Sequence, residues 1–162
     1  MPSTEIRAAR LEDEPELVAL DRANWSTLVS PAPLPDEGKP FFDERCRPEN
    51  VLVAVRGGSI VGYVRVDGGS IPASDHVAHV NGLVVAGSER RQGIGRALME
   101  EAMGQLRAKG RRRMTLRVLG HNVGARRLYG ACGFVVEGVL RGEFFLDGNY
   151  VDDVLMARDI PA

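Results

Sequence analysis

Between an apolar strand and the start of a helix, the chain reads Arg90-Arg91-Gln92-Gly93-Ile94-Gly95-Arg96. The N–H groups in the first turn of a helix have no partners within the helix, and with the positive end of the helix dipole they attract anions. Glycines at positions 93 and 95 allow a phosphate to approach the backbone. The stretch therefore predicts a turn that binds pyrophosphate, and the alternative is a tight turn whose glycines only serve packing.

Two common phosphate-binding loops are excluded by the residues that follow. A Walker loop requires Lys and then Ser or Thr after its last glycine, whereas Gly95 is followed by Arg96 and Ala97. A dinucleotide-binding fingerprint requires a third glycine where Leu98 stands, and an acidic residue after the next strand. The chain there reads Gly120-His121-Asn122, so neither requirement is met.

Hydrophobic periodicity divides the chain into helices and short strands. The periodicity predicts helices over residues 12–25, 93–109 and 123–131, and a proline-rich loop or broken helix over 30–40. It predicts strands over residues 51–55, 60–66, 77–85, 114–119, 134–145 and 150–158, with a short extended piece around Ile6. Gly57-Gly58 and the stretch 146–149 predict two hairpin turns. This order of elements indicates an α+β fold around a mixed sheet.

The strand over residues 77–85 carries two polar side chains on one apolar face. Strict alternation places on that face Val77, His79, Asn81, Leu83 and Val85, and on the other Ala78, Val80, Gly82 and Val84. This pattern predicts that part of the strand lines a cleft, with the water-exposed end of a sheet as an equal alternative.

A second motif follows the next strand and reads Asn122-x-x-Ala125-Arg126-x-Leu128-Tyr129-x-x-x-Gly133-Phe134. Together with Arg90-x-x-Gly93-x-Gly95, and in this order, it resembles the GNAT superfamily of acyl-CoA-dependent N-acetyltransferases. The resemblance covers about residues 50–158. It implies a three-layer α/β/α fold with a central mixed, mostly antiparallel sheet of about seven strands, and one N-acetyltransferase domain over residues 1–162.

The resemblance also implies how coenzyme A is bound. In the family, the backbone amides of the loop bind the pyrophosphate, which assigns this role to Arg90, Arg91, Gln92, Gly93, Ile94, Gly95 and Arg96. The strand before the loop pairs its backbone with the pantetheine arm, a role that falls on Leu83, Val84 and Val85. The resemblance also assigns coenzyme contacts to Ala125 and Arg127. Asn122 is either the N-cap of its helix or a hydrogen-bond partner of the pantetheine. Arg126, Arg127 and the 109–113 cluster are candidates for the 3′-phosphate, with solvated surface as the alternative.

The chemistry implied is direct transfer of an acetyl group from acetyl-CoA to a primary amine of a small molecule within a ternary complex. We expect backbone N–H groups around Leu83 to polarise the thioester carbonyl, and Tyr129 to protonate the departing sulfur. Family members often carry a glutamate as base on the fourth strand. This chain has none there, and His79, acting through water, is the candidate base. The alternatives are that His79 is structural and that the amine loses its proton to solvent without a dedicated base. The competing interpretation is an acyl-CoA-binding sensor or interaction module without turnover.

The charges are segregated along the chain although they nearly cancel. The chain has 21 basic and 22 acidic side chains, but residues 90–127 carry 11 basic and 2 acidic ones. We expect this segment to face the anionic coenzyme, which makes nucleic acid an improbable partner. The acidic remainder mildly favours a cationic acceptor through the carboxylates Asp36, Glu37, Asp43, Glu44, Asp152 and Asp153.

Other features of the composition exclude several classes of protein. Cys46 and Cys132 are too few for a disulfide framework and lack the spacing of a zinc site, so we expect packing thiols and no metal. No apolar run approaches the roughly 20 residues of a membrane helix, and the first residues lack a signal-peptide pattern. We therefore expect a cytoplasmic protein without a membrane partner. A homodimer is implied by the resemblance alone.

Overall fold

The structure is a computed structural model and describes residues 3–162, so that Met1 and Pro2, on which the signal-peptide interpretation partly depends, lie outside the described residues. Its strands are β1 (Thr4–Ala8), β2 (Val51–Arg56), β3 (Ser59–Gly68), β4 (Val77–Val85), β5 (Arg113–Leu119), β6 (Val135–Leu146) and β7 (Asn149–Asp159). Its α-helices are α1 (Glu14–Asn24), α2 (Ile94–Ala108) and α3 (Val123–Ala131). The helices and strands predicted from periodicity are thus confirmed, with small shifts at their ends, and the proline-rich stretch is a loop.

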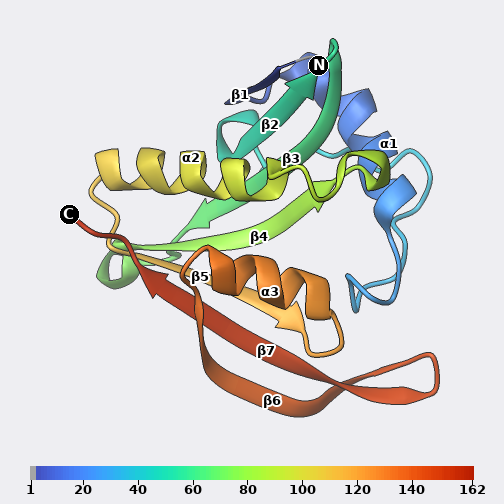
Figure 1. The fold of residues 1–162 in the computed structure, drawn as a ribbon, viewed down its shortest axis with the longest axis vertical. Helices are drawn as coiled ribbons and strands as arrows, with labels where there is room; N and C mark the ends of the chain where they lie inside the picture. The colour runs from blue at the N-terminus through green and yellow to red at the C-terminus, as the bar shows by residue number, and fades with distance from the viewer. Residues whose placement is uncertain (1–2) are drawn as a thin grey trace.

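The strands form one seven-stranded sheet in the order β1-β2-β3-β4-β5-β7-β6 (Figure 1). Among the strands of residues 3–162, only β4 and β5 are parallel, and they pair over just four residues, from Val77 opposite Arg113 to Val80 opposite Leu116. Every other neighbouring pair is antiparallel. The mixed, mostly antiparallel sheet is therefore confirmed, and it separates in its middle where the short parallel pairing ends.

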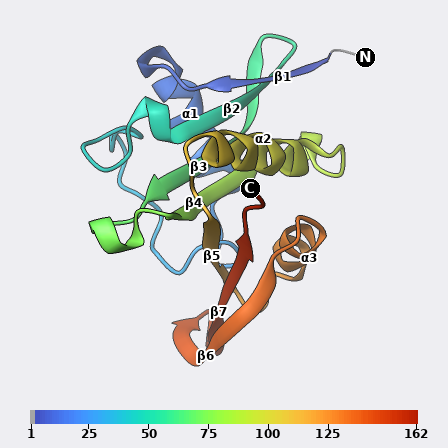
Figure 2. The ribbon, with the colours of Figure 1, turned by 90° about the vertical axis from the view of Figure 1, so that its left-hand side faces the viewer.

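Helices cover both faces of this sheet (Figure 2). On one face, α2 and α3 enclose a core that includes Leu98, Met114 and Tyr129. On the other face, α1 and the loop after it enclose a second core that includes Leu17 and Tyr63. The three-layer arrangement is confirmed, because each amphipathic helix buries its apolar face against the sheet. Among residues 3–162, no helix is both long and apolar enough to cross a membrane.

Two tight turns have the backbone that their residues predict. Gly57 and Gly58, between β2 and β3, have φ angles of 58° and 80°. Asp147 and Gly148, between β6 and β7, have φ angles of 49° and 79°. Positive φ at both central residues is the geometry of the two-residue hairpin turn, so both predicted hairpins are confirmed.

Strand β4 departs from the alternation predicted for it. Arg65 on β3 lies opposite Gly82 and Val66 lies opposite Val80, which leaves Asn81 as an extra residue without a partner. This bulge moves every later side chain to the opposite face. Leu83 and Val85 consequently pack with Val80 against the α2 side, and Val84 packs on the α1 side. The prediction that Leu83 and Val85 share a face with His79 is wrong, because alternation cannot show an inserted residue.

Candidate active site

A cleft opens where β4 and β5 diverge beyond their last paired residues. Its volume is about 1070 Å³, and its walls come from α1, the loop after it, β3, β4, β5, α3 and the closing hairpin. Seven residues predicted from the sequence to contribute to the cleft or to the coenzyme site line it: His79, Asn81, Leu83, Val84, Asn122, Ala125 and Tyr129. The cleft predicted from the polar side chains of β4 is therefore present, between the two halves of the sheet.

The strand edge inside this cleft is open. Residues Gly82 to Val85 pair on one side with β3. On the other side, the parallel pairing with β5 has already ended at Val80. The backbone N–H and C=O groups on that edge point into the gap, which is the arrangement that an extended, peptide-like ligand can pair with.

The glycine-containing turn leads directly into α2. Arg91 and Gly93 both adopt positive φ angles, 64° and 80°, and the helix begins at Ile94. Apart from its two neighbours in the chain, no residue within 3–162 has an atom within 4 Å of the position where a Gly93 Cβ would stand. The turn therefore exposes its backbone and the free N–H groups of the first helical turn, as a phosphate-binding turn requires.

Three of the four polar side chains of this turn contact the protein itself, whereas Arg91 is exposed and forms no hydrogen bond or ion pair within residues 3–162. Arg90 donates to the Val85 carbonyl oxygen at 3.4 Å and to Asn24 Oδ1 at 3.1 Å. Gln92 accepts a hydrogen bond from Arg56, and Arg96 forms an ion pair with Glu100 at 3.0 Å. An anion bound here would consequently meet the backbone amides and the guanidinium of Arg91, which agrees with the role that the resemblance implies for the loop.

Asn122 caps α3, as one of its two interpretations predicts. Its Oδ1 accepts a hydrogen bond from the backbone N–H of Ala125 at 3.2 Å. Both residues also line the cleft.

Arg126 donates to the Gly120 carbonyl oxygen at 3.1 Å, whereas Arg127 is exposed on the outer face of the helix. Of these two arginines, Arg127 is the one whose guanidinium remains available to a ligand.

Tyr129 lines the cleft from a buried position on α3. Its ring is 9% exposed and makes an edge contact with Phe134, with ring centroids 6.1 Å apart. Burial, and to a smaller extent the neighbouring Cys132, raises the pKa of Tyr129 to about 12. Within residues 3–162, no group forms a hydrogen bond with this hydroxyl. The phenol therefore stays protonated at neutral pH and is free to donate to a ligand.

His79 lies on β4, one residue before the parallel pairing with β5 ends. Its Nδ1 lies at hydrogen-bonding distance from Oγ1 of Thr115, the residue opposite it on β5. Both side chains line the cleft. His79 thus connects the two halves of the sheet just before they diverge, and its other ring nitrogen has no hydrogen-bond partner in the part of the chain that the structure describes.

The sequence analysis missed one pair of cleft residues, Asp21 and Tyr63. The Tyr63 hydroxyl donates a hydrogen bond to Asp21 Oδ1 at 2.5 Å, and both residues line the cleft. Burial raises the pKa of the Asp21 carboxyl, an effect that the Tyr63 hydrogen bond opposes. Asp21 follows the fully buried Leu17 by four residues, so an acid on the buried face of the helix was a signal in the sequence.

Three of the eleven basic side chains of residues 90–127 are paired in the fold with carboxylates from outside this segment. Arg111, Arg113 and Arg117 form ion pairs with Asp75, Glu137 and Asp153. The cluster 109–113 begins at the far end of α2, and a helix of 15 residues is about 22 Å long. This placement disfavours the cluster as a partner of a phosphate bound near the glycine turn.

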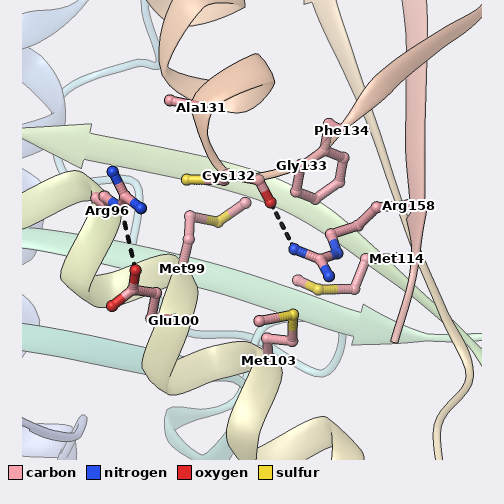
Figure 3. Close-up of a pocket in the computed structure, with 10 residues that line it drawn as sticks. All are labelled: Arg96, Met99, Glu100, Met103, Met114, Ala131, Cys132, Gly133, Phe134 and Arg158. Carbon is pink, nitrogen blue, oxygen red and sulfur yellow. Dashed lines mark hydrogen bonds and ion pairs between the residues drawn. The ribbon is translucent and has the colours of Figure 1, made fainter. Parts of the chain in front are cut away.

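A smaller cavity lies between α2 and the end of α3, on the face of the sheet that these two helices cover (Figure 3). Its volume is about 200 Å³, and Met99, Met103, Met114 and Cys132 line it. Arg158 donates to the Cys132 carbonyl oxygen at 2.6 Å. Burial raises the pKa of the Cys132 thiol, which keeps it in the unreactive protonated form and supports a packing role for it.

Comparisons with known proteins agree with this geometry. The sequence profile of the Acetyltransferase (GNAT) family matches residues 15–134. The L-amino acid N-acetyltransferase AaaT of Escherichia coli (strain K12) is 33% identical over 111 residues, which are 66% of this chain and 66% of that protein. The chain thus aligns with just under two thirds of that relative's length.

Solved structures show the same fold. The protein smu.2055 of Streptococcus mutans UA159 is 31% identical with a TM-score of 0.88, and the match covers 97% of this chain and 99% of that one. A phosphinothricin acetyltransferase of Sinorhizobium meliloti in complex with acetyl-CoA has a TM-score of 0.81 at 21% identity, covering 97% and 88% of the two chains. The profile match, the relative and the shared fold together place the chain in the GNAT family of acyl-CoA-dependent acetyltransferases.

Proposed function

We propose that the protein transfers the acetyl group of acetyl-CoA to a primary amine of a small molecule, within one ternary complex. The observation that carries this proposal is the cleft between β4 and β5, which combines an open strand edge with the hydroxyl of Tyr129, a group without a hydrogen-bond partner within residues 3–162. An enzyme that joins two substrates directly needs such a passage, where both can reach one point.

The coenzyme would lie along the edge of β4 with its phosphates at the start of α2. The pantetheine arm carries amide groups, so it can pair with the open edge of Leu83 to Val85 as an added strand would. The exposed backbone of the turn at Gly93 would receive the pyrophosphate. Asn122 and Ala125 line the same passage at the start of α3, and Arg127 lies on the outer face of this helix.

The transfer itself requires a donor for the carbonyl oxygen and a proton for the sulfur. A backbone N–H of the open β4 edge can donate to the carbonyl oxygen as negative charge develops on it. Tyr129 is protonated at neutral pH, and within residues 3–162 its hydroxyl has no hydrogen-bond partner. Burial makes this phenol a weaker acid than a free tyrosine, so we assign it a hydrogen bond to the departing sulfur and transfer of its proton once the thiolate has formed.

The relatives support a small-molecule acceptor. One is named for acetylating L-amino acids and another for acetylating phosphinothricin. The cleft has the size of a small-molecule site. We therefore assign the acceptor to small primary amines and place it on the α1 side of the cleft, because the coenzyme takes the α2 and α3 side.

The release of coenzyme A tests this proposal. The purified protein is incubated with acetyl-CoA and separately with phosphinothricin, single L-amino acids and aliphatic diamines, and free thiol is followed over time. We expect release that depends on the added amine and gives an N-acetylated product by mass spectrometry. Acetyl-CoA binding measured by calorimetry, without release for any amine, would instead favour the sensor interpretation.

A further inference from the structure

We infer that Asp21 accepts a hydrogen bond from the amino group of the acceptor and takes the proton that this group loses, while Tyr63 positions the Asp21 carboxylate. The inference rests on the proposed function, because it assigns the proton acceptor of the same reaction. It also supplies a base in a chain that has no glutamate on β4.

The Asp21 and Tyr63 pair lies against the backbone where the open edge of β4 begins. A Cβ added to Gly82 would stand 3.5 Å from the Tyr63 hydroxyl and 3.3 Å from its ring. Gly82 follows the bulged Asn81 and is the first residue beyond the bulge. The carboxylate is thus held next to the stretch of β4 whose backbone N–H groups are expected to meet the acetyl carbonyl.

A side cavity gives the acceptor room beside this pair. It has a volume of about 240 Å³ and shares Asp21, Tyr63, Asn81 and Pro35 with the walls of the main cleft. An acceptor whose body occupies the side cavity would have its amino group at the shared wall. The coenzyme in the main cleft would approach that wall from the other side.

The charges around Asp21 leave it available to an amine. None of the ion pairs formed within residues 3–162 includes Asp21. Tyr63 is its hydrogen-bond partner, and burial raises the pKa of the carboxyl, which favours uptake of a proton. The titratable and charged groups that line the two cavities with it are Arg22, Asp36, Lys39, Asp43, Cys46, Tyr63, Arg65, His79, Arg113, Arg117, Tyr129 and Glu137.

The proton balance of the step is closed by these two residues. The lone pair of the neutral amine forms the bond to the acetyl carbon, and the carbon–sulfur bond breaks with its electron pair on sulfur. Tyr129 gives a proton to the thiolate, and Asp21 takes one from the nitrogen as the amide forms. Exchange with water afterwards returns a proton to Tyr129 and removes one from Asp21.

The test compares Asp21→Asn with the wild type, using phosphinothricin and single L-amino acids as acceptors. Asn keeps the size of Asp and can still accept the Tyr63 hydrogen bond, so the fold is expected to persist, and its thermal unfolding is measured as a check. We expect kcat/KM for the amine to fall at least about 10-fold, because a hydrogen bond to a charged group is lost. The Kd of acetyl-CoA, measured by calorimetry, should not change.

The pH dependence provides a readout that a merely structural role would not move. Protonation of the free amine alone makes log kcat/KM rise with pH with a slope of about one. For the wild type, the slope should approach two below the pKa of Asp21, where a second proton must be lost. In Asp21→Asn the slope should remain near one over the whole acid range.

Two further variants keep the inference falsifiable. Tyr63→Phe removes the positioning hydroxyl, keeps the carboxylate and should cause an intermediate loss. Glu16→Gln removes one charge from the same helix, and its side-chain oxygen can still accept from the Ile60 N–H, so it should behave as wild type. Suppose that the wild type turns over an amine, and that kcat/KM of Asp21→Asn lies within about twofold of the wild-type value or its pH slope still reaches two. This result would overturn the inference about Asp21 and leave the proposed function standing. No turnover of any amine by the wild type would overturn the proposed function and this inference with it.

Discussion

Gly95 on α2 and Leu128 on α3 lie so close that a Cβ on the glycine would stand 3.1 Å from Leu128 Cδ2. Val85 Cγ2 would be 3.7 Å from the same point. Gly95 therefore allows two helices and β4 to meet at the side of the glycine turn. Its packing role, offered from the sequence as the alternative to phosphate binding, is present, while Gly93 with its positive φ and open surroundings fits the phosphate role.

Replacing Gly95 by Val should destabilise the fold. The added methyl groups would be forced against Leu128, and overpacking of this kind costs about 1–3 kcal/mol. Urea denaturation measures the difference in the free energy of unfolding. Gly104→Val is the matched control, because Gly104 lies on the same helix with no atom within 4 Å of its Cβ position. An equal loss in both variants would contradict the packing argument.

Replacing Tyr129 by Phe should lower kcat and leave the fold intact. The hydroxyl has no hydrogen-bond partner within residues 3–162, so its removal breaks no contact of the protein. Loss of a general acid lowers kcat by roughly 10²-fold or more. Steady-state kinetics at saturating acetyl-CoA should show this loss with little change in thermal stability. A variant with wild-type kcat would show that the thiolate leaves without this proton.

Alkaline pH should destabilise the protein through its buried tyrosines. An unfolded tyrosine has a pKa near 10, whereas burial raises that of Tyr129 to about 12 and that of Tyr63 further. Above pH 10 the unfolded chain loses protons that the folded chain keeps, so stability falls as pH rises, by about 1.4 kcal/mol per pH unit for each tyrosine. Denaturation curves between pH 10 and 12 should show a shallower fall for Tyr129→Phe. Tyr150→Phe, at a position that is 78% exposed, should not alter it.

Arg127 should contribute to acetyl-CoA affinity through its charge. Its side chain is exposed on α3 and has no ion-pair partner in the part of the chain that the structure describes. Arg127→Gln should weaken binding roughly two- to five-fold at low salt, and the difference should shrink as salt is added. Lys109→Gln, at the far end of α2, is the control and should bind as the wild type does. Calorimetric titrations at two salt concentrations measure both, and equal behaviour of the two variants would exclude a specific role for Arg127.

His79→Gln distinguishes the base proposed from the sequence from the one inferred from the structure. The change removes the contact of His79 with Thr115, and we expect a loss of about 1 kcal/mol in stability. If Asp21 is the proton acceptor, kcat/KM of His79→Gln should fall less than that of Asp21→Asn. The plot of log kcat/KM against pH for His79→Gln should still reach a slope of two at acid pH. If the slope falls to one in His79→Gln and still reaches two in Asp21→Asn, His79 and not Asp21 is the base.

Local sequence determined most of the elements and the two motifs that the resemblance assigns to the coenzyme. The four-residue periodicity of α2, the paired positive-φ residues of the two hairpins and the Asn122 cap depend on neighbours within a few positions. Such features are readable because their causes are local. The resemblance then ordered these elements into the seven-stranded sheet that the structure shows.

Which side chains line the cleft was decided by the tertiary structure alone. The bulge at Asn81 depends on the register between β3 and β4, and the partnership of Asp21 with Tyr63 joins residues 42 positions apart. The tertiary structure also decided which charges of the basic segment are paired, since Arg111, Arg113 and Arg117 form ion pairs with carboxylates that lie distant in sequence. Pairing across a sheet and packing of a helix on it are set by the whole fold, because strand register and helix orientation are fixed only when the cores close. The sequence thus determined the family and the class of reaction, and the fold decided which side chains line the cleft.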